Sequence, residues 1–380
     1  MGDRTSRSRG SLNGPRSLSI AANPFQDVKS FPATRPFDQY GAGMDDSRPE
    51  LVLIEMGSMR GLEIGPLANP RVRRAQGSIT YLDHASTAAL KEKYATNTQL
   101  ADLIDAIVDV DIVQRPDQTL AEAVGTRDQF DYVIAAHVFE HIPDVIDWLS
   151  QIEAVLVTGG ILSLVIPDKR FTFDINRRTT EVGEVLDAYL RNMKSPTFAQ
   201  MFDFFAHTVT IDGMVDAPGI WAGTADYTGV VRDDVPDSDA AAFGFCRDQQ
   251  RSPSFVDVHC HVFTPVSFLD IFEMLVKLDL TNFEIGAFFD TQVNTFEFHV
   301  SLRKASVDHG RDRLRDQQYA SIRAARNEIA VASNGGPEQP AGGDTGGGHL
   351  VVEVSRLEER ALHLKRRVLH RVRHRRPLGG

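Results

Sequence analysis

Two carboxylates and a glycine near the start of the apolar part of the chain have the types and spacing needed to bind a nucleoside. Glu63 lies at the end of a short apolar run that continues into Gly65. A glycine there lets the backbone approach a ligand, and the residues that follow offer backbone N–H groups. Asp83 ends the next apolar run, where one carboxylate can accept both hydroxyls of a ribose. The pattern predicts a nucleoside-binding crevice, with a helix cap as the alternative role for Asp83.

A second group of residues has spacings that occur in metal enzymes. His137, Glu140 and His141 spell the H-x-x-E-H pattern of inverted zinc peptidases, and His259 with His261 gives the H-x-H pattern of barrel metallohydrolases. The peptidase site needs both histidines on one helix face, but His137 ends a predicted strand. The barrel site needs ligands on later strands, and only a hairpin follows. We therefore expect no metal site, and a zinc hydrolase is the least favoured function.

Three side chains are candidates for removing a proton from a substrate. His137 ends the predicted fourth strand, Asp168 follows the fifth, and His261 follows a long insertion. A histidine is the natural general base for a hydroxyl at neutral pH. The alternative for His261 and its neighbour His259 is hydrogen bonding at a strand edge, and the alternative for Asp168 is a solvated turn.

Residues near these bases are candidates for holding the molecule that reacts. Lys169 and Arg170 follow Asp168 directly and can hold a hydroxyl, a carboxylate or a phosphate. Several aromatic side chains in the insertion would make a platform for a sugar, although core packing is the alternative. They are Phe198, Phe202, Phe204, Phe205, Trp221 and Tyr227.

The elements that must position these residues alternate between apolar runs and helical patterns. Such alternation predicts βαβ crossovers and a parallel sheet, and the unbroken apolar run at 160–167 is typical of a strand buried on both faces. We expect strands at 61–65, 78–83, 106–113, 130–137 and 160–167, and a closing hairpin at 283–290 and 296–304. We expect helices at 88–94, 119–124, 145–156, 181–193, 264–278 and 309–331.

These motifs together resemble those of class I S-adenosylmethionine-dependent methyltransferases. The resemblance covers roughly residues 55–170, through Glu63-Ile-Gly65-Pro, Asp83 and the stretch from Phe130 to Ile142, and it is looser over 260–304. The subtype it resembles is the bacterial methyltransferases that modify surface polysaccharides or sugars. Where the family usually has a second and a third glycine, this chain has Leu67 and Asn69.

The resemblance implies a fold, a cofactor and roles for particular residues. The fold would be α/β: a Rossmann-like, doubly wound, seven-stranded and mostly parallel sheet with an inserted helical cap and a separate C-terminal helix. The cofactor would be S-adenosyl-L-methionine. Its binding residues would be Glu63, Gly65, Asp83, Asp117, Gln118 and His137. Asp117 and Gln118 would lie near the adenine, with an N-cap for the next helix as the alternative for Asp117, and His137 would face the sulfonium and the methyl acceptor.

Composition divides the chain into segments with different charge. The net charge is −11, but residues 356–376 hold nine Lys or Arg and two Glu, so the rest carries about −18. An acidic body excludes a protein that coats nucleic acid. We expect a disordered leader at 1–49, an S-adenosylmethionine-binding core at 50–170, an inserted cap at 171–255, the end of the core sheet at 256–305, a helix at 306–331, a Gly/Pro linker at 332–348 and a basic helical tail at 349–380.

Location and partners follow from the same segments. Two cysteines cannot form a disulfide framework, no apolar run is long enough for a membrane span, and the first 40 residues lack a signal peptide. We expect a cytoplasmic protein whose basic tail is suited to an anionic membrane surface or an acidic partner. A solvated helix that pairs with another copy is the alternative for the tail.

The expected function is O-methylation of a sugar or another small-molecule hydroxyl, with S-adenosylmethionine as the methyl donor. The acceptor oxygen attacks the methyl group in line, so the protein must align the two molecules and remove one proton. The alternative is a non-catalytic binding or scaffold protein on a degenerate methyltransferase fold, which Leu67 and Asn69 favour.

Overall fold

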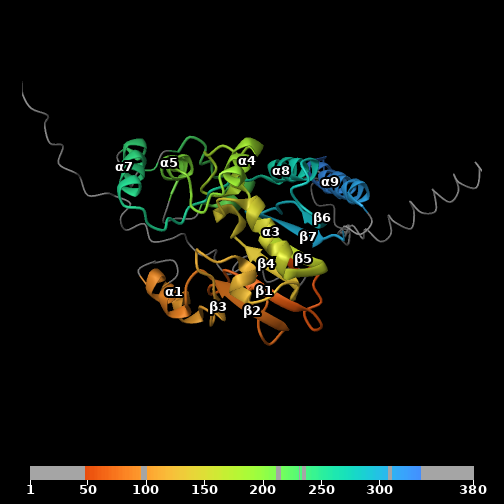
Figure 1. Ribbon diagram of the computed structural model, residues 1–380. Helices are drawn as coiled ribbons and strands as arrows, with labels where there is room; N and C mark the ends of the chain where they lie inside the picture. Colours follow the sequence, from red (N-terminus) through yellow and green to blue (C-terminus); the bar gives the residue numbers. More distant parts are fainter. Residues whose placement is uncertain are drawn as a thin grey trace, which may run out of the picture.

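Parallel strands joined by helices form the centre of the molecule (Figure 1). The computed structural model describes residues 48–95, 101–210, 215–230, 232, 237–306 and 310–334. The predicted leader up to residue 47, the linker beyond residue 334 and the basic tail lie outside these residues. Within them, no helix has the length and apolar character that crossing a membrane requires.

Within the described residues, seven strands form one sheet in the order β3-β2-β1-β4-β5-β7-β6. The strands β1 to β5 pair in parallel, and β7 runs antiparallel to both of its neighbours. The predicted seven-stranded, mostly parallel α/β sheet is confirmed. Because β2, β1 and β4 are adjacent, the loops that follow them lie side by side. The strands are β1 (Arg60–Ile64), β2 (Ser78–Asp83), β3 (Ile112–Val113), β4 (Phe130–Ala136), β5 (Leu156–Pro167), β6 (Phe283–Phe289) and β7 (Glu297–Lys304).

The third strand is shorter than the sequence predicts. We expected residues 106–113 to be extended, but only the last two pair with β2, and Ala101–Ala106 forms the 3-10 helix η3. The backbone N–H of Val108 donates to the carbonyl of Leu67. The carboxylate of Asp111, rather than a backbone carbonyl, accepts the N–H of Tyr81 in β2. The backbone N–H groups of Val108 and Tyr81 are therefore not available for further pairing between β3 and β2.

The six helices expected from the sequence within these residues are present, with ends shifted by a few residues, and the insertion contains three further helices that were not predicted, α5, α6 and α7. Thr119, Thr197 and Thr264 cap α2, α5 and α8, each accepting the N–H of the third helical residue. The helices are α1 (Thr87–Tyr94), α2 (Leu120–Val124), α3 (Val145–Val155), α4 (Val182–Leu190), α5 (Phe198–His207), α6 (Ala217–Trp221), α7 (Ser238–Arg251), α8 (Pro265–Lys277) and α9 (Arg311–Asn334), with short 3-10 turns η2 (Pro49–Leu51), η4 (Phe139–His141) and η5 (Lys169–Phe171).

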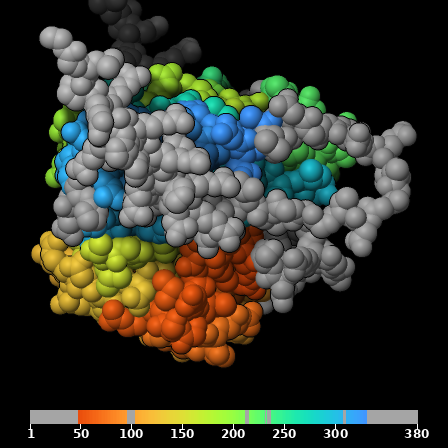
Figure 2. Space-filling model, turned by 90° about the vertical axis from the view of Figure 1, so that its right-hand side faces the viewer, coloured from red at the N-terminus to blue at the C-terminus, as the bar shows by residue number. Residues whose placement is uncertain are grey.

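The main core lies between the sheet and the helices α3, α8 and α9. Ile152 of α3, Leu275 of α8 and Leu164 of β5 are at most 2% exposed and belong to one cluster. Each such side chain contributes about 2 kcal/mol through burial. On the opposite face of the sheet, Ile54 and Val72 pack against side chains of the strands in a second buried cluster. In the side view of Figure 2, the blue surface of α9 lies above the red and orange surface of the N-terminal part of the sheet.

The region between β5 and α8 contains α4, α5, α6 and α7. Helices α5 and α7 pack on each other through Phe205 and Phe245, whose ring centroids are 4.4 Å apart. Phe204 is fully buried in the same cluster, and Trp221 of α6 stacks on Phe171 at 4.2 Å. These aromatic residues therefore form core contacts, which is the alternative to the platform for a sugar.

Candidate active site

Glu63, near the end of β1, shapes the loop that follows the strand. Its carboxylate oxygens accept the backbone N–H groups of Arg71 and Val72 at 2.6 and 3.2 Å. Burial raises the pKa of Glu63 to about 7, although these hydrogen bonds and the Arg71 charge oppose that effect. Both carboxylate oxygens of Glu63 therefore hold the loop that follows β1.

The loop after β1 turns at two residues with left-handed backbone. Gly65 has φ of +66°, and its N–H donates to the carbonyl of Leu82 at 2.9 Å. A Cβ at Gly65 would lie 3.2 Å from a methyl group of Val138, so the backbone passes close to the loop after β4. Leu67 has φ of +44°, which costs a residue with a Cβ roughly 1–2 kcal/mol. The chain keeps the glycine-like turn although the side chain is leucine.

Asp83 ends β2 next to this loop. Its side chain is buried, and the oxygen Oδ1 accepts the N–H of His84 at 2.7 Å and lies 2.6 Å from the ring Nδ1 of the same residue. No helix is capped by Asp83, since Ser86 caps α1. Because Ile64 pairs with both Leu82 and Ala135, Asp83 lies beside Gly65 and near the residue that follows β4.

The two residues predicted to lie near the adenine are in the loop before α2. The side chain of Asp117 is 75% exposed, and its carboxylate lies 3.2 Å from Nε of Arg115. Gln118 accepts the N–H of Arg115 at 3.3 Å. The N-cap of α2 is Thr119, which excludes the alternative role of Asp117 as the cap. The adenine contact itself stays a prediction.

His137 follows β4 with left-handed backbone, φ +53°. Its Nε2 lies 2.6 Å from a carboxylate oxygen of Glu297, and its Nδ1 lies 3.5 Å from Glu140. Burial lowers the pKa of His137, but the two carboxylates outweigh burial and raise the pKa to about 9. His137 is therefore held as a cation at neutral pH, in which state it cannot accept a proton.

His261 is enclosed by the protein. The residue is 1% exposed, and its Nε2 lies 3.3 Å from the carbonyl oxygen of Pro143. Burial lowers the pKa of His261 to about 4. This corrects the expectation that His261 reaches the mouth of the pocket, because the insertion folds over the segment that carries it.

Asp168 is also enclosed, and its carboxylate is occupied. Arg170 donates from Nε and Nη2 at 2.6 to 3.0 Å, and the hydroxyl of Thr291 donates at 2.7 Å. This corrects the expectation that Asp168 accepts a proton from substrate, because strong donors already hold both oxygens. Asp168 positions Arg170, whose side chain is 49% exposed.

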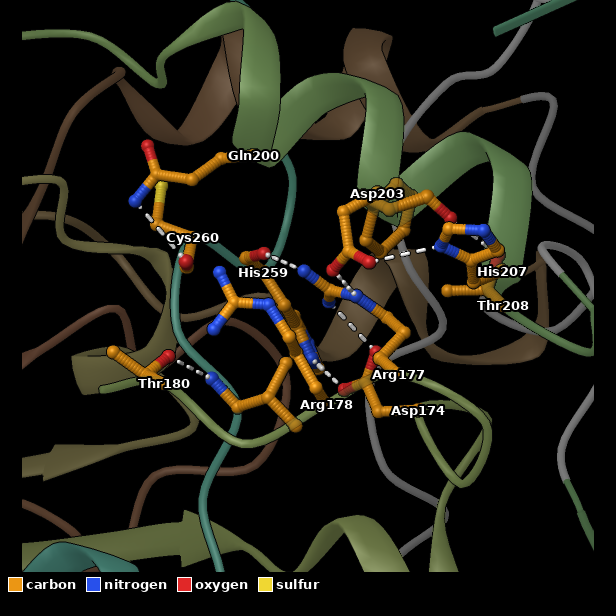
Figure 3. A network of polar contacts seen from close by, with 12 residues as sticks. Asp174, Arg177, Arg178, Thr180, Gln200, Asp203, His207, Thr208, His259 and Cys260 are labelled. Carbon is orange, nitrogen blue, oxygen red and sulfur yellow. Dashed lines mark hydrogen bonds and ion pairs between the residues drawn. The ribbon is translucent and has the colours of Figure 1, made fainter. Parts of the chain in front are cut away.

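His259, two residues before His261, belongs to a buried polar network (Figure 3). Its Nδ1 lies 2.5 Å from Asp174, which also accepts a hydrogen bond from Nη1 of Arg177 at 2.8 Å. The same guanidinium donates to Asp203 of α5 at 2.7 Å and to the carbonyl of His259 at 3.0 Å. The network fixes the orientation of the His259 ring.

Sequence reasoning missed several acidic residues of the site. Glu297, Asp174 and Asp257 each contact a histidine ring, at 2.6, 2.5 and 2.9 Å respectively. No local spacing marks them, because each comes from a segment far along the chain from its partner. Glu140 and His141 of the peptidase pattern lie in the three-residue 3-10 turn η4, so they do not share a helix face with His137.

One family of known proteins matches part of the chain. Residues 54–162 match the model of a family described as a methyltransferase domain. No curated protein sequence matches the chain. Among solved structures, an S-adenosylmethionine dependent methyltransferase from Mesorhizobium loti has 12% identity over 66% of this chain and 93% of its own, with a TM-score of 0.31.

Two further solved structures are similar at the same level. A SAM-dependent methyltransferase from Methanosarcina mazei has 15% identity over 66% of this chain and 94% of its own, with a TM-score of 0.32. The CurJ carbon methyltransferase has 13% identity over 67% of this chain and a TM-score of 0.31, and the match spans half of its length. Such scores assign no role to any residue.

The family match covers the part of the chain that forms the first four strands of the sheet. Residues 54–162 include β1, β2, β3 and β4 with the loops that follow them, and the beginning of β5. Residues 54–162 are therefore similar to a methyltransferase domain, and they are built into a Rossmann-like α/β sheet.

Proposed function

We propose that this protein transfers the methyl group of S-adenosylmethionine to an oxygen of a sugar or another small-molecule hydroxyl. The observation that carries the proposal is the position of Gly65, Asp83 and His137, which follow three adjacent strands inside the matched methyltransferase domain. Ligands of open α/β sheets bind outside the carboxyl ends of the strands. The names of the similar solved structures include S-adenosylmethionine, which is in line with this choice of donor.

The residues have distinct roles in the proposed reaction. The turn at Gly65 brings the backbone close to the methionine moiety, and the carboxylate of Asp83 accepts hydrogen bonds from the ribose hydroxyls. The acceptor oxygen forms a bond to the methyl carbon as the sulfur–carbon bond breaks, and the acceptor releases one proton. The products are a methyl ether and S-adenosylhomocysteine. His137 borders the reacting groups.

Arg170 is the residue best suited to hold the acceptor. Its guanidinium is half exposed although two carboxylates, Asp168 and Asp290, lie within 4.0 Å of it. A guanidinium in such a position can form paired hydrogen bonds with a carboxylate or phosphate. An acceptor with an anionic group, such as a sugar phosphate, fits this arrangement. The association of residues 349–380 with an anionic membrane surface or an acidic partner stays a prediction from their composition.

The experiment that tests the function uses S-adenosylmethionine with an isotopic label in its methyl group. The full chain is incubated with panels of free sugars, sugar phosphates and extracted glycolipids, and products are separated and examined by mass spectrometry. We expect the label in a methyl ether, with sugar phosphates favoured over neutral sugars. Label on carbon, nitrogen or sulfur would contradict transfer to oxygen.

The second candidate is a binding or scaffold protein that does not transfer a methyl group. The leucine in a left-handed position of the loop, Leu67, is the observation that favours it, because its side chain stands where the family has none. Cofactor binding separates the two candidates, since a scaffold that has lost its cofactor will not bind S-adenosylmethionine.

A further inference from the structure

Glu140 carries a buried carboxylate that makes no hydrogen bond within the described residues. The residue is 0% exposed, and neither of its oxygens has a hydrogen-bond partner. Burial of an ionised carboxylate is strongly unfavourable unless it is paired or coordinates a metal. Both oxygens of this carboxylate therefore lack the hydrogen bonds that usually accompany burial.

Three histidine rings surround this carboxylate. Nδ1 of His137 lies 3.5 Å from Oε1 of Glu140, and Nε2 of His141 and Nε2 of His259 each lie 4.0 Å from the same oxygen. These separations exceed the 2.7–3.2 Å or so of an ordinary hydrogen bond. They are close to the distances between ligand atoms around a common ion. The ligand atoms of Glu140, His141 and His259 all lie within 4.8 Å of one another.

The opposite nitrogen of each ring contacts a carboxylate. The pairs are His137 Nε2 with Glu297 at 2.6 Å, His141 Nδ1 with Asp257 at 2.9 Å, and His259 Nδ1 with Asp174 at 2.5 Å. A histidine that binds a metal almost always donates its other ring N–H to such a group, which fixes the ring and its tautomer.

Each of the three carboxylates that contact the histidine rings also lies near a basic side chain. Lys93 lies 3.2 Å from Asp257, Arg177 lies 2.8 Å from Asp174, and Arg71 lies 4.0 Å from Glu297. Each of these carboxylates therefore lies between a histidine ring and a second basic side chain.

We propose that Glu140, His141 and His259 bind a divalent transition-metal cation, with His137 at its border. A set of two imidazoles and one carboxylate suits zinc, iron(II) or cobalt(II), whereas magnesium prefers a shell of oxygens. Metal–ligand distances are about 2.0–2.2 Å. The ligand atoms of the three side chains must therefore move closer together by roughly 1 Å when the cation binds. The short turn η4 and the extended segment at residues 256–263 carry all three.

The position of the site suggests what the cation does, and this part depends on the proposed methyl transfer. The side chains of His137 and His141 are 18% and 22% exposed, whereas Glu140 and His259 are enclosed. The partly open side lies just beyond β4, where the acceptor is expected. A cation there would bind the acceptor oxygen and lower the pKa of its hydroxyl. This role is fitting because Asp168 and His261 are enclosed by the protein and do not reach the acceptor.

The test measures metal binding without any substrate. Untagged full-length protein is stripped with a chelator and titrated with zinc, cobalt(II) and magnesium, and its metal content is measured by elemental analysis. We expect one equivalent of zinc or cobalt to bind, with a visible cobalt spectrum typical of nitrogen and oxygen ligands, and no comparable binding of magnesium. Glu140→Gln and His259→Gln should weaken zinc binding at least about 100-fold.

The control is His261→Gln, which replaces an equally buried histidine on the same segment and should keep the metal. Circular dichroism with chelator present shows whether each variant folds, and Glu140→Gln preserves the shape of the side chain. If stripped wild-type protein binds zinc no better than Glu140→Gln, the histidines form only a polar cluster around the carboxylate and the metal site is refuted. If the metal binds but S-adenosylmethionine does not, the site stands and the proposed methyl transfer fails.

Discussion

The Nε2 atom of His137 lies 2.6 Å from a carboxylate oxygen of Glu297, which joins residues 160 positions apart in the chain. Glu297 begins β7, the strand that runs antiparallel to β5, and it also lies 4.0 Å from Arg71. Arg71 belongs to the loop that Glu63 holds after β1. The antiparallel end of the sheet therefore helps to fix both loops of the proposed cofactor site, and mutations in β7 can alter them without contacting a ligand.

Replacement of Asp83 by Asn should weaken S-adenosylmethionine binding. The amide can accept only one of the two ribose hydrogen bonds, and a lost hydrogen bond to a charged group costs about 1.5–3 kcal/mol. Isothermal titration calorimetry should show a Kd raised by at least about tenfold. The control is Asp131→Asn at the opposite end of β4, where the carboxylate accepts the N–H of Arg60. Equal affinity of both variants for the cofactor would refute the ribose contact.

Replacement of Leu67 by Gly should strengthen cofactor binding. Glycine adopts φ of +44° without a steric penalty, so the loop after β1 no longer carries a strained residue. We expect Kd to fall by about fivefold, equivalent to about 1 kcal/mol. Asn69→Gly serves as the control, because Asn69 is not in a left-handed conformation. An unchanged or higher Kd for Leu67→Gly would mean that the leucine is no obstacle.

The free energy of unfolding should depend on pH through Glu63. Its pKa is about 7 in the folded protein, whereas an exposed glutamate has a pKa of 4.5, so the folded state binds more protons between these pH values. The contribution of Glu63 to stability is therefore complete below about pH 4.5 and is lost as pH rises through about 7. This contribution of Glu63 to the free energy of unfolding amounts to roughly 3 kcal/mol at most.

The measurement compares urea denaturation of wild-type protein and Glu63→Gln between about pH 5 and pH 8. The variant cannot accept both backbone N–H groups, so its stability is lower throughout, but its dependence on pH should be flatter. If the free energy of unfolding of the variant changes with pH in parallel with that of the wild-type protein, Glu63 does not titrate in this range.

The sequence predicts the sheet well and the site only in part. Strand β2 has the predicted ends, because a run of apolar residues ends at a charged one, Asp83. The strand before α2 was predicted too long, because the side chain of Asp111 takes the place of a backbone carbonyl. A side chain that accepts a hydrogen bond in place of a backbone carbonyl leaves no periodic pattern in the sequence.

The surroundings of the candidate proton acceptors could not be predicted, for a different reason. Asp168 and His261 do lie near the ends of the expected elements, but their protonation depends on partners from distant segments. The pattern H-x-x-E-H was noticed and set aside as a helical motif. Glu140 of this pattern lies beside His259, which is 119 positions further along the chain, and only the folded chain shows that the two are neighbours.

Asp168 should be a structural residue rather than a base. Replacement by Ala removes the partner of Arg170 and of the buried hydroxyl of Thr291, which should lower the free energy of unfolding by about 2 kcal/mol. A double-mutant cycle with Thr291→Val, measured by urea denaturation, should give a coupling energy of about 1 kcal/mol. Additive effects would show that the two side chains do not interact.

The most direct test of the account is calorimetric titration of the wild-type protein with S-adenosylmethionine and with S-adenosylhomocysteine. We predict that both bind with one-to-one stoichiometry, with Kd values of about 1 mM or lower, and that the Asp83→Asn variant binds both more weakly. Absence of heat from either compound with folded wild-type protein at millimolar concentration would contradict the proposed methyltransferase.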